Sequence, residues 1–235
     1  MNYAMDNPIA IRASESERAG FIRRTYGHLA GAILAFIILE YALLQLPNVD
    51  SLVRGMVSNP ISWLVVIGLY MGVSFLAEMW ARSDTSPGLQ YLGLGLYVVA
   101  IGVVFLPLLW LAAIALDDVR VIWNAGLLTL CMFGGLTLAA FTTRKDFSFL
   151  GPILWIGGFL AFGAVIAFTF IGGSAFGLGI AFAMVALTSV SILYQTSNVI
   201  HHYRTDQHVA AALALFAAVA TMFYYILWIL MASRE

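Results

Sequence analysis

The sequence predicts an all-α integral membrane protein, a seven-transmembrane-helix bundle with little structure outside the bilayer. Of its 235 residues, 62% are hydrophobic and only 10% are charged, whereas soluble domains carry roughly 25% charged residues. Apolar runs of about 20 residues, the length that crosses a bilayer as a helix, follow one another along the chain. These runs are longer than membrane strands and lack two-residue alternation, which argues against a β-barrel.

The apolar runs divide the chain into spans and short loops. Seven runs are long enough to span: residues 27–46, 61–80, 89–116, 121–141, 150–171, 175–200 and 209–231. Asn59 and Pro60 introduce the second run, and Pro152 lies in the first turn of the fifth, where a helix tolerates proline. The third run is the longest and could be two shorter pieces, and its Pro107 is a physical cause for a kink.

A polar segment precedes the first span. Residues 1–26 are polar and mixed in charge, unlike a signal peptide, in which an apolar stretch follows a short basic start. The remaining polar segments are too short to fold separately. We therefore expect a cytoplasmic N-terminal segment over residues 1–26 and one seven-helix membrane domain over residues 27–232.

The basic residues predict the orientation of the bundle. Eight of the eleven lie in segments that would share a side with the N-terminus: Arg12, Arg18, Arg23, Arg24, Arg82, Arg144, Lys145 and Arg204. The other three are Arg54, Arg120 and Arg234. Because short cytoplasmic loops are enriched in Lys and Arg, this bias predicts a cytoplasmic N-terminus. With seven spans, the C-terminus would lie outside.

Small residues recur four positions apart, as in Gly27 with Gly31 and in Gly173 with Gly177. In lipid, such spacing lets two helix backbones approach closely. The pattern is typical of packing within a helical bundle, and it also occurs at dimer seams.

Composition argues against several classes of function. A net charge of −1 gives no basic field for nucleic acid, and a single cysteine, Cys131, excludes an intrachain disulfide. The only lysine, Lys145, lies in a predicted loop, so no retinal Schiff base is expected, and no aspartate falls within a predicted span. We expect no enzymatic activity, no cofactor and no nucleic-acid partner. We expect the protein to be embedded in the lipid bilayer.

Ionisable groups are costly to place in lipid, so those found in or near spans are candidates for a functional role. Two sets of charged residues here are candidates for a pathway or a gate. Glu40, deep in the first run, is either a cation or proton site, or a neutral hydrogen-bonded side chain, or one that reaches the outer interface beside Gln45. Glu78 and Arg82 have the spacing and order of a helical ion pair. That pair is either a latch at the inner gate or an interfacial pair of little energetic consequence.

Three histidines lie in the segment that joins the last two spans, at His201, His202 and His208. Imidazoles titrate between about pH 5 and 8, so this loop is a candidate pH sensor. Their spacing matches no established metal motif, and a solvated loop is the simpler interpretation.

Several segments resemble the Bax inhibitor-1 (transmembrane Bax inhibitor motif) family. Residues 143–151 read Thr-Arg-Lys-Asp-Phe-Ser-Phe-Leu-Gly, similar to the family's threonine–basic–Asp-Phe-Ser…Gly junction. Residues 193–200 resemble its Leu-Tyr-Asp-Thr-Gln-x-Ile segment, and residues 211–216 resemble the start of its last helix. The approach to the first span, residues 21–26, and the stretch around Gly102 also fit, so the resemblance covers nearly the whole chain.

The resemblance implies a seven-helix fold with the last helix near the centre, a pH-sensitive calcium leak and a role in stress or cell-death regulation. In the family, that leak depends on two aspartates, one on each of the last two helices, which an arginine can latch. Here the two positions correspond to Gln195 and Ala218, the following asparagine to Thr221, and the arginine to Arg82. Gln195 and Ala218 cannot ionise, so the proton-sharing chemistry of a carboxylate pair is missing.

Two functions follow as hypotheses for a multi-pass protein of the bacterial cytoplasmic membrane. The first is a passive pathway for a cation, such as a calcium leak, or for a small solute, with a gate altered from the family pattern. The second is a non-transporting regulator that binds other membrane proteins, such as quality-control proteases. Glu40 and the polar end of the sixth span favour transport, whereas the missing aspartates favour regulation.

Overall fold

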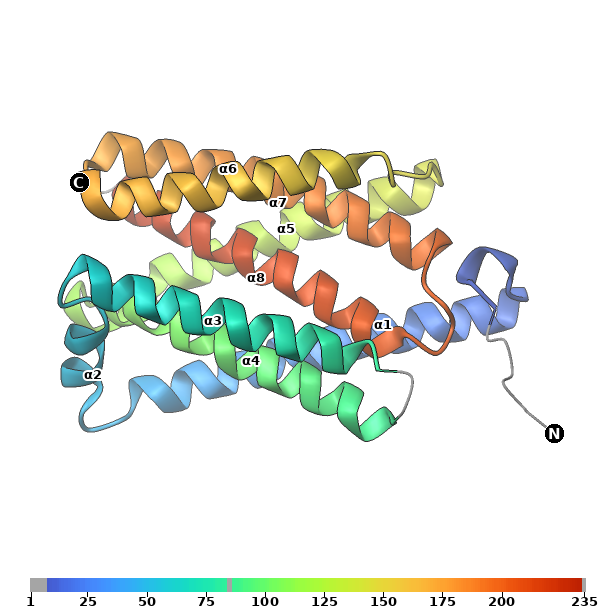
Figure 1. Ribbon diagram of the computed structural model, residues 1–235, viewed down its shortest axis with the longest axis horizontal. Helices are drawn as coiled ribbons and strands as arrows, with labels where there is room; N and C mark the ends of the chain where they lie inside the picture. The colour runs from blue at the N-terminus through green and yellow to red at the C-terminus, as the bar shows by residue number, and fades with distance from the viewer. Residues whose placement is uncertain (1–7, 84–85, 234–235) are drawn as a thin grey trace.

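The computed structural model describes residues 8–83 and 86–233, and these form an all-helical bundle (Figure 1). Its α-helices are α1 (Glu15–Leu44), α2 (Val49–Met56), α3 (Pro60–Ala81), α4 (Pro87–Trp110), α5 (Val119–Thr143), α6 (Leu150–Ile171), α7 (Ser174–His201) and α8 (His208–Ala232). A 3-10 turn (Ala10–Arg12) precedes α1, and a π-helical turn (Leu111–Ala115) extends α4.

The predicted seven spans and the all-α class are confirmed. Seven of these helices are long and apolar enough to cross a membrane, and each overlaps one of the predicted runs over nearly its whole length. The first helix begins at Glu15, well before the predicted span, because Ser14 and Glu17 form a reciprocal capping box that satisfies free N–H groups of its first turn. Arg234, used in the charge comparison, lies outside the described residues.

The third apolar run forms one continuous span and not two pieces. The helix passes through Pro107 and ends in the π-helical turn, where the Leu116 N–H donates to the Leu111 carbonyl at 2.9 Å. Proline removes one bond from the helical ladder, and π turns occur where that ladder is locally widened. The π-helical turn begins four residues after Pro107, beyond the turn from which the proline removes a hydrogen bond.

A short amphipathic helix, α2, lies in a segment that the sequence analysis treated as a loop. Val49 and Val53, four residues apart, are buried against the end of α4. The Trp110 indole N–H donates to the Asp50 carboxylate at 2.6 Å, and the Arg54 guanidinium lies 6.0 Å from the centre of the same ring. These contacts hold α2 across the ends of the spans.

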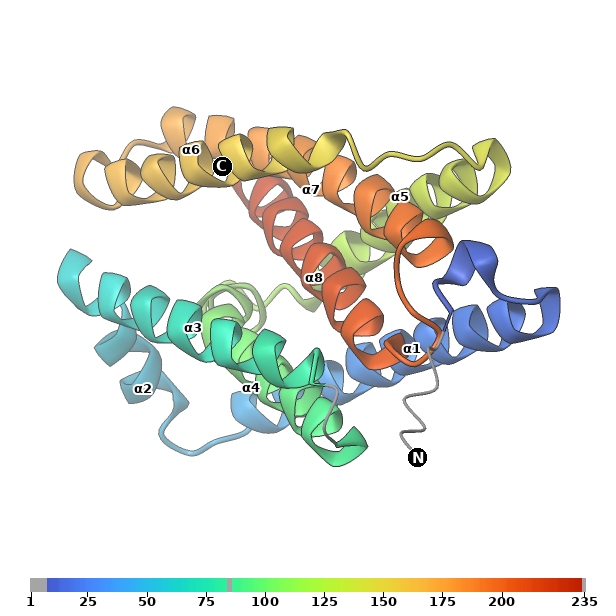
Figure 2. The ribbon, with the colours of Figure 1, turned by 45° about the vertical axis from the view of Figure 1, so that its right-hand side comes forward.

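The last helix occupies the centre of the bundle, as the family resemblance implies. Figures 1 and 2 show α8, in red, passing between the α6–α7 pair on one side and α1, α3 and α4 on the other. It contacts α1, α3, α4, α5 and α7, and it has more buried residues than any other helix described. By contrast, α6 packs mainly on α7 and has no buried residue, so its surface faces lipid.

The segment before α1 and the α7–α8 connection meet at one end of the bundle. Ile9 and Arg204 form an antiparallel bridge, and the Ala10 N–H donates to the Tyr203 carbonyl at 2.8 Å. The start of α1 and the end of α8 lie at opposite ends of the long axis (Figure 1). With seven spans, the segment before α1 and the α7–α8 connection lie on the same side of the membrane, and the end of α8 lies on the other side. Both observations agree with this arrangement.

Candidate functional site

A partly polar cavity of about 520 Å³ lies between α3, α7 and the central helix α8, with single contributions from α4 and α6. Four of the residues singled out in the sequence line it: Glu78, Gln195, Ala218 and Thr221. They come from three different helices, so tertiary packing brings them together. Among the described lining residues, Glu78 carries the one carboxylate.

The α3 side of the cavity is a polar stripe at helical spacing. Tyr70, Ser74 and Glu78 follow one another at intervals of four residues and therefore share a face. The Tyr70 hydroxyl is 2.9 Å from the Tyr97 hydroxyl of α4. The Ser74 hydroxyl is buried one helical turn from Tyr70 on this face.

The opposite side is formed by α7 and α8. Thr188, Ser191 and Gln195 share one face of α7, and the Thr188 hydroxyl donates to the Met184 carbonyl of its own helix at 2.8 Å. On α8, Ala218 contributes a methyl group and Thr221 donates its hydroxyl to the Ala217 carbonyl at 2.8 Å. The two positions that correspond to the family's aspartates thus line the same cavity with an amide and a methyl group.

The predicted pair of Glu78 and Arg82 is formed. The Arg82 guanidinium donates to the Glu78 carboxylate at 2.7 Å, and both side chains are about half exposed, 53% and 51%. An exposed pair of this kind contributes only about 0–1 kcal/mol to stability. Its chemical consequence is that the carboxylate of the cavity already has a cationic partner.

Glu40 lies away from this cavity, at the end of the buried stripe of α1. It is 4% exposed, and among the described residues neither carboxyl oxygen has a hydrogen-bond partner. The facing position on α4 is Gly102, where an added Cβ would lie 3.1 Å from a Glu40 oxygen. Glu40 is therefore neither hydrogen-bonded to a described residue nor exposed at the outer interface beside Gln45. It does not line the cavity that Gln195 lines.

Replacing Glu40 by glutamine should leave both folding and transport unchanged. An isolated ionised carboxylate in an apolar interior is far costlier than a neutral group, and glutamine keeps the shape and polarity of the neutral carboxyl. We expect the free energy of unfolding of Glu40→Gln to change by no more than about 1 kcal/mol. Thermal unfolding and liposome ion flux of the purified variant would check this, and a large flux defect in a well-folded variant would contradict it.

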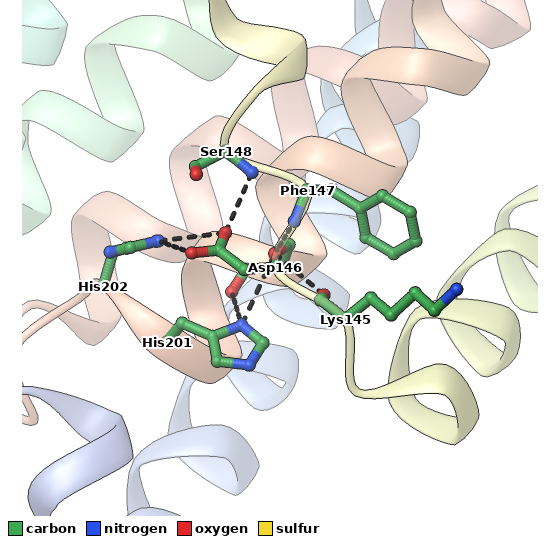
Figure 3. A network of polar contacts seen from close by, with 7 residues as sticks. Lys145, Asp146, Phe147, Ser148, His201 and His202 are labelled. Carbon is green, nitrogen blue, oxygen red and sulfur yellow. Dashed lines mark hydrogen bonds and ion pairs between the residues drawn. The ribbon is translucent and has the colours of Figure 1, made fainter.

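The two motif segments that carry the family resemblance meet at the end of the bundle where α1 begins (Figure 3). The buried Ser197 hydroxyl of α7 accepts a hydrogen bond from the Phe147 N–H at 2.9 Å and lies 3.5 Å from the Lys145 carbonyl. The Asp146 carboxylate accepts from the Ser148 N–H at 2.9 Å and contacts His202 at 3.1 Å. The conspicuous residues of the α5–α6 loop therefore anchor it to α7.

These contacts lower the pKa of the Asp146 carboxyl below its usual range. The main cause is the hydrogen bond from the Ser148 backbone, and the contact with His202 adds to it. Because the pKa of Asp146 is depressed, the stabilisation from the contacts of its ionised carboxylate is fully present above the usual aspartate pKa. This stabilisation is lost as the pH falls through the lowered pKa.

The three histidines do not form one cluster. His201 is buried, with its Nδ1 3.0 Å from the Ser197 carbonyl, while His202 is half exposed at Asp146. His208 begins α8, with its ring centre 4.9 Å from that of His28. Within residues 8–83 and 86–233, no group of three or more His, Cys, Asp or Glu side chains could hold a metal ion.

The sequence analysis missed the hydroxyl-bearing residues of the cavity. Tyr70, Ser74, Thr188 and Ser191 were not singled out, although their spacing places each pair on one helix face. A search of the apolar runs for polar residues at intervals of three or four would have found them. Such a search does not reveal that the two faces oppose each other.

The fold is that of a multi-pass integral membrane protein, because seven of its helices are long and apolar enough to cross a membrane. The last helix is central, and the partly polar cavity lies beside it. A family model described as "Inhibitor of apoptosis-promoting Bax1" matches residues 18–235. The chain therefore belongs to the Bax inhibitor-1 family, as its motifs predict.

Relatives are found in bacteria and plants. The chain is 29% identical to an uncharacterized protein of Pseudomonas aeruginosa, over 92% of this chain and 91% of the other. It is 30% identical to the modulator of FtsH protease YccA of Escherichia coli, over 77% and 80%. A BI1-like protein of Arabidopsis thaliana is 27% identical, over 91% and 80%.

Proposed function

We propose that this protein regulates other membrane proteins, with a membrane-bound quality-control protease as the partner, and does not conduct calcium. The observation that carries the proposal is the chemistry of the cavity between α3, α7 and α8. Gln195 and Ala218 occupy the positions of the carboxylate pair, and Glu78 is held by Arg82 at 2.7 Å. The similarity to a modulator of FtsH protease supports a protease as the partner.

Co-reconstitution tests this proposal. The full chain is placed in liposomes with the FtsH-type protease of the same organism and a membrane-protein substrate, and the rate of substrate degradation is measured. We expect the rate to change with the ratio of chain to protease until it saturates, and the two proteins to co-purify from mild detergent. An unrelated seven-helix protein serves as the control for crowding. A rate that does not respond, together with no association, would refute the proposal.

A second candidate is a passive pathway for a monovalent cation or a small polar solute. The cavity of about 520 Å³, lined by hydroxyls, an amide and Glu78, favours it. The test is potassium flux into liposomes that contain the wild type or Glu78→Gln. A flux that exceeds that of protein-free liposomes and falls in the variant would support the pathway, and wild-type flux at the protein-free level would exclude it for potassium.

We also propose a bacterial cytoplasmic membrane location with the N-terminus inside. In a Cys131→Ser background, Ser16→Cys should react with an impermeant thiol reagent only from the cytoplasmic side, and Ser233→Cys only from the outside. This expectation rests on the bias of basic residues toward the N-terminal side. It also rests on the positions of the start of α1 and the end of α8, which lie at opposite ends of the bundle (Figure 1). The reverse labelling pattern would contradict this orientation.

A further inference from the structure

A second cavity, of about 540 Å³, runs as an open groove between α1 and α4. Its walls are almost entirely apolar, and its floor contains Gly27, Gly31 and Gly95. A Cβ added at any of these three glycines would meet nothing within 4 Å. The pair Gly27 and Gly31 therefore does not mediate close packing within the bundle, but leaves an empty channel on its surface.

One end of the groove carries polar groups of the kind found at a membrane interface. Arg24, His28 and Tyr91 line that end. His28 Nδ1 lies 2.7 Å from the Arg24 carbonyl and therefore donates to it, which leaves Nε2 to accept from the Tyr91 hydroxyl at 3.1 Å. Tyrosine and arginine are typical of the headgroup level of a bilayer, so this end lies at the membrane surface where α1 begins.

Arg24 has no ion-pair partner among the described residues, and its one hydrogen bond to the chain is a long contact of 3.4 Å from Nε to the Gly20 carbonyl. Its guanidinium is free to bind an anion at the mouth of the groove. Arginine binds phosphate groups in a fork geometry, and basic residues at the membrane surface attract anionic lipids.

The groove is longer than the hydrocarbon part of one leaflet. From Arg24 to Leu39, α1 rises about 22 Å at 1.5 Å per residue, compared with about 15 Å for half of the hydrocarbon core. Leu39 closes the far end, because its side chain lies over Gly102, where an added Cβ would be 2.8 Å away. The groove thus extends from the headgroup level past the middle of the bilayer and then stops.

We propose that the groove between α1 and α4 binds one anionic phospholipid, with its phosphate at Arg24 and an acyl chain along Gly27, Gly31 and Gly95. The unpaired cation at the headgroup level and the open apolar groove below it match the two parts of such a lipid. The site is separate from the cavity between α3, α7 and α8, and it does not depend on the function proposed for that cavity.

Native mass spectrometry of the detergent-solubilised full chain, titrated with phosphatidylglycerol or with phosphatidylcholine of the same acyl chains, tests the site. We expect one phosphatidylglycerol to bind more tightly than phosphatidylcholine. Arg24→Gln should weaken phosphatidylglycerol binding about fivefold, which corresponds to ~1 kcal/mol per basic residue, and remove the preference. Arg23→Gln, on the adjacent exposed residue, is the matched control and should change nothing.

Filling the groove tests the acyl-chain part. Gly31→Leu should abolish the binding of both lipids, whereas Gly158→Leu on the exposed surface of α6, where an added Cβ also meets nothing, should not. If Gly31→Leu fails to fold, Gly95→Leu on the other wall takes its place. Equal affinity for the two lipids, or unchanged binding in the filled variants, would overturn the proposal. It would also be overturned if Gly31→Leu converted a dimer to a monomer without affecting lipid, because the groove would then be a surface between copies of this chain.

Discussion

Restoring the two family aspartates, by Gln195→Asp together with Ala218→Asp, should create a pH-dependent calcium flux that the wild type lacks. Both positions line one cavity on facing helices. Two carboxylates in one site titrate as a coupled pair, so their combined charge changes with pH. Arg82, now bound to Glu78 at 2.7 Å, would gain a competing acidic partner. We expect calcium uptake to rise on the order of tenfold and to vary across about pH 5 to 8.

The measurement is calcium uptake into liposomes loaded with an indicator dye, compared among the wild type, the two single variants and the double variant. Each single variant adds one carboxylate without its partner and is the matched control. The same triple replacement of His201, His202 and His208 in all four proteins removes the imidazoles in and beside the α7–α8 connection. A double variant that folds and remains as impermeable as the wild type would show that the cavity cannot conduct calcium even with the pair in place.

Gly93→Ala should strongly destabilise the bundle, because α3 and α4 pack through this glycine. An added Cβ would lie 2.5 Å from the Ala77 carbonyl oxygen and 2.6 Å from the Ala81 amide nitrogen, both backbone atoms that cannot turn aside. Overpacking a rigid contact costs about 1–3 kcal/mol, and this contact should reach the upper end. The clash would also displace Glu78, which lies between those two residues and lines the cavity.

Thermal unfolding in detergent would measure this effect against Gly95→Ala. Gly95 lies two residues further along the same helix, and an added Cβ there meets nothing within 4 Å. Because alanine is a better helix former than glycine by about 1 kcal/mol, Gly95→Ala should be as stable as the wild type or more so. Equal stability of the two variants would contradict the close approach of α3 and α4 at Gly93.

The number and type of spans could be predicted because lipid imposes them. A segment in hydrocarbon must satisfy its own backbone groups, so a long apolar run leaves few alternatives to a helix. The early start of α1 and the presence of α2 depend on weaker local signals. The Ser14–Glu17 capping box and the spacing of Val49 and Val53 are visible in the sequence, but neither belongs to an apolar run of spanning length.

The candidate site was predictable in part: Glu78 was selected as a charge near a span, and the other predicted residues of the cavity came from the family resemblance. It identified Gln195 and Ala218, which the structure brings to one cavity. Glu40 was selected on the rule that charges in lipid are functional, yet it lies apart from that cavity. The anchoring of the α5–α6 loop by Ser197 joins residues 50 positions apart, and no local pattern specifies such a contact.

Calcium uptake by the wild-type chain tests the central claim most directly, since the claim is that this member of the family does not act as a calcium leak. The purified protein in liposomes is compared with protein-free liposomes from about pH 5 to 8. With Gln195 and Ala218 at the positions of the carboxylate pair and Glu78 held by Arg82, we predict uptake at the protein-free level at every pH. A strong wild-type leak would contradict the claim, and its persistence after replacement of His201, His202 and His208 would point to Glu78 or Glu40 as the acid responsible.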